Sequence, residues 1–242
     1  MLPIPIPGFS DPISAITHLV AALVFFVFGF PLLLQARGSA VRVVTIGIYV
    51  FSVVFLLSMS GVFHLLDHDG AGRAVLQRLD HAGIFVLIAG TFTPVHAILF
   101  RGFWSWGFLL LVWVLAITGL TLTTIFFNDM AEWLGLVFYL GLGWLGIVSG
   151  YLTHRLHGFE VVKPLIYGAL AYTVGAIMEF MRWPVIIDGV VGPHELFHVA
   201  VIAGVAWHWL FIRNLLKQPG QEREVNGNTE PDLNSDSCSD SL

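Results

Sequence analysis

The sequence predicts an all-α membrane protein, a seven-transmembrane helix bundle that ends in a disordered acidic C-terminal tail. Of the 242 residues, 57% are hydrophobic and 11% are charged, whereas about 25% of the residues of a soluble domain are charged. The charge is also unevenly placed: residues 219–242 hold six acids and one base, a net charge of −5, while residues 1–218 hold ten of each. Water does not solvate a neutral and largely apolar body of this size.

Seven apolar stretches have the length of about 20 residues that a helix needs to cross a hydrocarbon core of about 30 Å. Their approximate bounds are 13–35, 43–66, 79–100, 103–127, 130–152, 161–181 and 192–216. Transmembrane strands alternate over about ten residues, so these continuous runs favour helices. Ser10 and Asp11 precede the first helix and are suited to cap it. Only Asn128 and Asp129 separate the fourth helix from the fifth.

The last three helices carry features of their own. The fifth contains Gly141, Gly143, Gly146 and Gly150, whose spacing is typical of tight helix packing. Glu179 lies near the end of the sixth helix, and we interpret it as an interfacial residue. The seventh helix begins with two histidines that are one turn apart.

The expected domain organisation is simple. Residues 1–217 form one transmembrane domain, and residues 218–242, rich in Glu, Asp, Asn, Ser and Gly, form a disordered polar tail. The sequence begins without the charged segment and cleavage site of a removable signal peptide. Its single cysteine, Cys238, excludes an intrachain disulfide, and the neutral body has no basic patch for nucleic acid.

Ten histidines interrupt the apolar body and its connections, and ionisable residues in membrane helices are costly enough to be functional candidates. In a seven-helix protein, odd-numbered helices begin and even-numbered helices end at the face that holds the N-terminus. Connectivity therefore gathers six of the histidines at this face: His18, His64, His68, His81, His194 and His198. Ser60 and Asp80 join them there.

Spacing turns part of this group into a predicted metal site. His194 and His198 are four residues apart, so both imidazoles project from one side of a helix. Neutral imidazole is the usual ligand of zinc, and a third histidine would complete a three-ligand site with one open position. His64, at the end of the second helix, is the candidate for that ligand. Asp80 is suited to hold a water in the open position, and Ser60 precedes His64 by one turn.

We expect the other histidines to have structural roles. A single histidine in a helix commonly hydrogen-bonds a backbone carbonyl, which is the expected role of His18, His96, His154, His157 and His208. His68 and His81 lie at a predicted loop. We expect them to be solvated, or to contact the metal ligands without binding the metal themselves.

Four motifs stand out: Ser60-x3-His64, Arg-Leu-Asp-His-Ala-Gly-Ile at 78–84, Gly-Thr-Phe-Thr-Pro at 90–94, and His-Glu-Leu-Phe-His at 194–198. Together they resemble the hemolysin III family, the bacterial branch of the PAQR group that also holds the adiponectin and membrane progestin receptors. The resemblance covers nearly the whole membrane body. The chain departs from the family near its start, where Asp11 stands in place of a frequent glutamate.

The resemblance implies specific roles for the clustered residues. It implies that His64, His194 and His198 bind zinc, that Asp80 reaches the metal through a water, and that Ser60 lies beside it. It also implies a multi-pass location, in the bacterial cell (inner) membrane. Since the wider superfamily includes alkaline ceramidases, the resemblance further implies hydrolysis of a lipid amide.

The favoured function is therefore a zinc-dependent hydrolase that acts on a lipid amide or ester from within the bilayer. Asp80 would accept the proton of the attacking water, and Ser60 would hydrogen-bond the substrate carbonyl. The expected partner is a membrane lipid or a lipid-derived substrate. Two alternatives stay open: a non-catalytic receptor or sensor with a structural zinc, and a pore-forming, hemolysin-like protein.

An intramembrane protease is a less favoured alternative. Residues 194–198 spell the H-E-x-x-H motif of zinc proteases, with Glu195 as the general base. The only later histidine, His208, is ten residues on, about 15 Å along the same helix, which is too far to share the metal. We therefore expect Glu195 to face interfacial water or a basic partner.

Two indications disagree on the orientation in the membrane. Arginine and lysine predominate on the face opposite the clustered histidines, and the positive-inside rule then places the C-terminus in the cytoplasm. The resemblance to the adiponectin receptors implies the reverse.

Overall fold

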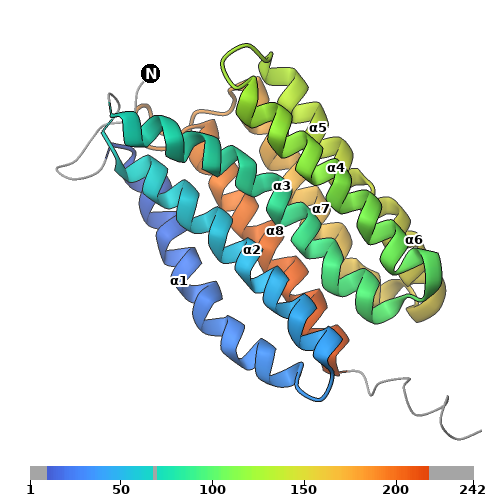
Figure 1. Ribbon diagram of the computed structural model, residues 1–242. Helices are drawn as coiled ribbons and strands as arrows, with labels where there is room; N and C mark the ends of the chain where they lie inside the picture. The colour runs from blue at the N-terminus through green and yellow to red at the C-terminus, as the bar shows by residue number, and fades with distance from the viewer. Residues whose placement is uncertain (1–9, 68–69, 218–242) are drawn as a thin grey trace, which may run out of the picture.

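The computed structural model describes residues 10–67 and 70–217, and these residues form a bundle of tilted, roughly aligned helices (Figure 1). The elements are α1 (Pro12–Gln35), α2 (Ala40–Leu65), α3 (Ala71–Leu99), the short 3-10 helix η1 (Gly102–Trp104), α4 (Trp106–Ile125), α5 (Glu132–Trp144), α6 (Gly146–His157), α7 (Phe159–Met181) and α8 (Pro193–Lys217). Seven helical stretches within the described residues are long and apolar enough to cross a membrane, which confirms the predicted fold class. The predicted tail, residues 218–242, lies outside the described part of the chain.

The third helix begins earlier than the apolar pattern predicts. The predicted start was residue 79, but α3 begins at Ala71, directly after Gly70. The intervening residues include Gln77 and two arginines, so a rule based on apolar length assigns them to a loop. They continue the helix beyond its apolar part, and this extension carries Arg73 to the start of α1.

The fifth membrane span is broken in the middle. Leu145 lies between Trp144, the last residue of α5, and Gly146, the first residue of α6, so the span consists of two shorter helices. The four glycines predicted to pack tightly here do not do so: a Cβ on Gly141 or Gly143 would meet no atom within 4 Å, and one on Gly146 or Gly150 would make only an ordinary van der Waals contact, at 3.9 and 3.8 Å. Glycine is a poor helix former because it loses the most backbone freedom on folding. Its abundance here therefore coincides with a helix break rather than with close packing.

Close helix packing occurs between other helices, including α1 and α2. A Cβ on Gly61 of α2 would lie 2.6 Å from the Leu19 side chain of α1, which is too close for a real contact. The backbone N–H of Asp11 also donates to the carbonyl of His64, at 3.0 Å. The start of α1 and the end of α2 are thus held together, and Figure 1 shows them at the same end of the bundle as the starts of α3 and α8.

Candidate metal centre

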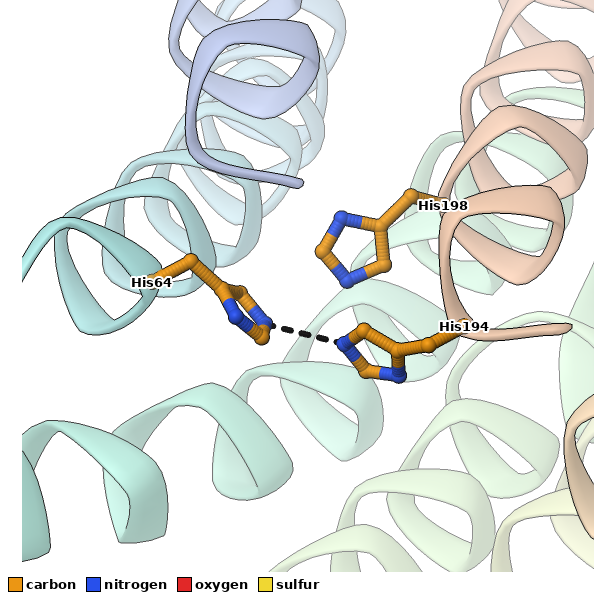
Figure 2. A group of neighbouring side chains, drawn as sticks. All are labelled: His64, His194 and His198. Carbon is orange, nitrogen blue, oxygen red and sulfur yellow. Dashed lines mark hydrogen bonds between the residues drawn. The ribbon is translucent and has the colours of Figure 1, made fainter. Parts of the chain in front are cut away.

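Three histidines converge at this end of the bundle. One ring nitrogen from each of His64, His194 and His198 lies within 4.8 Å of the other two. His64 comes from the last turn of α2, and the other two come from the first turns of α8. Figure 2 shows the three rings turned toward a common point. His64 and His198 are buried, and His194 is partly exposed. The structure therefore brings together the three histidines that the sequence predicts as ligands.

The first turn of α8 sets the direction of its two histidines. Glu195 accepts a hydrogen bond from the N–H of Gly192 at 2.8 Å, and this contact satisfies one free amide at the helix start. The other carboxylate oxygen of Glu195 accepts from the hydroxyl of Ser14 on α1, at 3.0 Å. Glu195 is buried, so the expectation that it faces interfacial water is wrong. It anchors α8 to α1 and leaves His194 and His198 on the side that faces α2.

Asp11 supports His64 from behind. Its carboxylate accepts hydrogen bonds from Nδ1 of His64 at 2.9 Å and from the guanidinium of Arg73 at 2.7 Å. Burial alone would raise the pKa of Asp11, but the hydrogen bonds from His64 and Arg73 outweigh it and lower this pKa to about 2. Asp11 is therefore a carboxylate at neutral pH. The predicted capping role is wrong, because the side chain turns to these two partners and makes no cap hydrogen bond.

Glu179 supports His194 in the same way. Its Oε1 lies 3.0 Å from Nδ1 of His194, and both side chains are about one third exposed. We interpreted Glu179 from the sequence as interfacial, and that interpretation missed this contact. A carboxylate on the far nitrogen of an imidazole fixes the tautomer and ring direction of a metal ligand. Two of the three histidines have this support.

The third histidine is held differently. The ring of His198 stacks on the ring of His18 from α1, with centroids 3.7 Å apart and planes 14° apart. Among the described residues, neither nitrogen of His18 makes a hydrogen bond of normal geometry, although the backbone of His198 lies near the ring. The expected backbone contact of His18 is therefore not well formed, and its side chain packs face to face against His198.

The donor set fits a zinc ion. A carboxylate can only accept a hydrogen bond, so Nδ1 of His64 and Nδ1 of His194 both carry protons, and in a neutral ring Nε2 then keeps a lone pair. These two Nε2 atoms are 3.0 Å apart (Figure 2). Without a metal, this separation fits a hydrogen bond from the Nε2–H of one protonated ring to the lone pair of the other, whereas two neutral rings offer both lone pairs to one cation. Two nitrogens in tetrahedral zinc coordination, with bonds of 2.0–2.1 Å, are about 3.3 Å apart, close to the observed separation.

The two predicted catalytic residues lie near this centre. Asp80 is half-buried on α3 and interacts electrostatically with His64 and His194. Ser60 is buried on α2, one turn before His64. Among the described residues, no hydrogen bond joins either side chain to the three imidazoles. Their proposed parts in catalysis stay predictions.

Several other histidines have the expected structural roles. His96 contacts the carbonyl of Trp104 through Nδ1 and the hydroxyl of Ser149 through Nε2. His208 contacts the carbonyl of Leu165 through Nε2, at 3.2 Å. His81 contacts the carbonyl of Gln77 on its own helix. Neither His154 nor His157 hydrogen-bonds through its side chain within the described residues, so the expected backbone contact is wrong for these two. His68 lies outside the described residues.

An apolar groove of about 670 Å³ lies elsewhere on the bundle. Residues from the start of α2, the end of α3 and the start of α4 line it: Ala40, Val41, Val44, Thr45, Ile48, Thr93, Trp106, Leu109, Leu110 and Trp113. His64 is at the opposite end of α2, so this groove is separate from the histidine centre.

Seven apolar helices with a buried histidine group at one end define a multi-pass membrane protein with a candidate metal centre. Residues 9–209 match the family model described as Haemolysin-III related. The chain belongs to this family. It is similar to Hemolysin-3 of Bacillus cereus, with 33% identity over 198 residues that cover 80% of this chain and 85% of the relative.

Two further relatives agree with this assignment. The Hemolysin-3 homolog of Bacillus subtilis (strain 168) is 32% identical over 202 residues, covering 80% of this chain and 88% of the relative. Heptahelical transmembrane protein 5 of Arabidopsis thaliana is 29% identical over 177 residues, which cover 64% of this chain and 46% of the plant protein. These relatives confirm the resemblance to the hemolysin III family and its PAQR group.

Proposed function

We propose that the chain is a zinc-dependent hydrolase of the bacterial cell (inner) membrane, acting on a lipid amide or ester. The observation that carries the proposal is the convergence of His64, His194 and His198, with carboxylates on the far nitrogens of two of them. When bound, zinc would polarise the substrate carbonyl and lower the pKa of a bound water toward about 7.

The residues of the chain would divide the remaining work. Asp80, near His64 and His194, would accept the proton of the attacking water. Ser60 would donate a hydrogen bond to the carbonyl oxygen, where negative charge develops. Asp11 and Glu179 would keep the imidazoles in the tautomer that presents Nε2. Because the helices around the site are apolar enough to lie in a bilayer, a substrate that already resides in the membrane is the natural class.

The test combines metal content with turnover. Purified protein is analysed for zinc and incubated with ceramides and with ester lipids of matched chain length, with and without a chelator. One zinc per chain and product that requires zinc are expected. In Asp80→Asn, the expected result is retained zinc and a loss of turnover of at least about 100-fold. Turnover equal to wild type in this variant would remove Asp80 from the mechanism.

A receptor or sensor with a structural zinc is the second candidate. This function is favoured because the proposed ligands come from two different helices. A metal bound to His64, His194 and His198 would link the end of α2 to the start of α8. One zinc per chain with no turnover of any lipid would support this function instead. Removal of zinc would then lower the thermal stability of the protein without any enzymatic readout.

The other two alternatives have less support. For a protease, Glu195 would have to act as the general base, but both its carboxylate oxygens already accept hydrogen bonds from Gly192 and Ser14. For a pore, charged side chains should line an axis through the bundle. Among the described residues, the buried Asp, Glu, Lys and Arg side chains are those of Asp11 and Glu195 alone, and both lie at the histidine end.

A further inference from the structure

His18 is a buried polar residue that the proposed mechanism does not use. It lies on α1 with 2% of its surface exposed, and in the described part of the chain neither ring nitrogen makes a hydrogen bond of normal geometry, although the backbone of His198 lies near the ring. Burying an unpaired polar group costs about 1–3 kcal/mol. Such a residue is expected to contribute something that an apolar side chain in its place would not.

The His18 ring stacks on a proposed zinc ligand. The ring lies parallel to that of His198, with 3.7 Å between centroids and 14° between planes. Stacked aromatic pairs contribute about 0.5–1.5 kcal/mol beyond the area that they bury. His18 therefore covers one face of the His198 ring and restricts its rotation.

His198 is also the ligand that lacks a carboxylate partner. Nδ1 of His64 contacts Asp11, and Nδ1 of His194 contacts Glu179. By contrast, Nδ1 of His198 is buried without a partner of normal hydrogen-bond geometry, although the backbone of Ser14 lies near the ring. The outer hydrogen bond that usually orients a metal-binding imidazole is thus weak or missing at this position.

We infer that His18 is a positioning residue, and that its stacked ring holds the third ligand, His198, in the plane required for zinc binding. The inference rests on the zinc site proposed above. An imidazole that donates its lone pair to a cation becomes electron-poor, and such a ring is attracted to the π face of a neutral neighbour. The stack therefore stabilises the zinc-bound state more than the metal-free state.

Two substitutions of His18 test separately whether its aromatic face or its ring nitrogens affect zinc binding. His18→Phe keeps an aromatic face without nitrogens, and His18→Leu keeps much of the volume without an aromatic face. Zinc affinity is measured by competition with a chelator, and the geometry by the visible absorption spectrum of the cobalt-substituted protein. We expect His18→Phe to bind zinc within about threefold of wild type and to keep the cobalt spectrum. His18→Leu is expected to bind about tenfold more weakly and to change the spectrum.

Phe25→Leu is the matched control. Phe25 is buried on α1 two turns after His18 and contacts Trp209 rather than a ligand. This variant is expected to lower thermal stability and to leave zinc affinity unchanged. If His18→Phe were as weak as His18→Leu, the nitrogens rather than the face would matter. If both bound zinc like wild type, His18 would only fill space. Either result overturns the positioning role while the zinc site stands, whereas a wild type without zinc overturns both.

Discussion

His64 and His194 differ from His96 and His208 in what holds their rings. Nδ1 of His64 and of His194 contacts a carboxylate, and the two Nε2 atoms then face each other at 3.0 Å. His96 and His208 instead contact backbone carbonyls, and His96 also contacts a serine hydroxyl. A carboxylate on Nδ1 raises the basicity of Nε2 as a ligand, whereas both ring nitrogens of His96 contact protein groups, which leaves neither for a metal. The partner of a buried histidine thus indicates its role better than its burial does.

Among the variants that test this comparison, those that remove a zinc ligand should show the largest change, a loss of bound zinc. His64→Ala and His198→Ala are each expected to lower zinc from about one per chain to near zero after dialysis, because two imidazoles are too few for a stable zinc site. His96→Ala should retain wild-type zinc. Elemental analysis of the three purified variants measures the difference. If His96→Ala loses zinc as readily as His64→Ala does, the distinction between ligand and structural histidines is wrong.

Removal of a carboxylate should have the next largest effect. Glu179→Gln and Asp11→Asn keep the volume of each side chain but weaken the contact with Nδ1, so we expect zinc affinity to fall by about 10- to 100-fold. Chelator competition measures the affinity. Glu160→Gln is the matched control, since Glu160 is an exposed acid of α7 that pairs with Lys163. Wild-type affinity in both test variants would show that these carboxylates do not support the ligands.

These two carboxylates also mark the limit of what the sequence could predict. The ligand set was predictable because helix connectivity places His64 near the start of α8, and a spacing of four residues places His194 and His198 on one side of it. Asp11 and His64 are 53 positions apart, and their contact depends on how α1 packs against α2. Glu179 contacts His194 across the turn between α7 and α8. No periodic pattern encodes such contacts.

The fold, like the site, could be predicted from the sequence only in part. Apolar length located all seven spans, because each must cross a hydrocarbon core. The same rule placed the start of α3 too late, since the residues from Ala71 onward are helical but polar. It also missed the break at Leu145, because apolar length carries no information on whether a helix is continuous.

A structural histidine should affect stability rather than metal binding. In His96→Leu, the carbonyl of Trp104 and the hydroxyl of Ser149 lose a buried partner. We expect the free energy of unfolding to fall by about 1–3 kcal/mol, with zinc content unchanged. Thermal unfolding in detergent with excess zinc measures this effect. A His96→Leu protein as stable as wild type would show that these contacts contribute little to the bundle.

The smallest effect is expected at Glu195, the acid between the two α8 ligands. Glutamine can still accept the hydrogen bond from the N–H of Gly192 through its carbonyl oxygen, and glutamine serves at this position of a helix start as glutamate does. Glu195→Gln should therefore lose less than about 1 kcal/mol of stability and keep wild-type zinc and turnover. Glu195→Ala, which removes the contacts with Gly192 and Ser14, should lose about 1 kcal/mol or slightly more. A protease with Glu195 as its general base requires the opposite result, a Gln variant that folds and binds zinc but is inactive. Side-by-side measurement of melting temperature, zinc content and lipid hydrolysis in the two variants distinguishes a helix cap from a catalytic base.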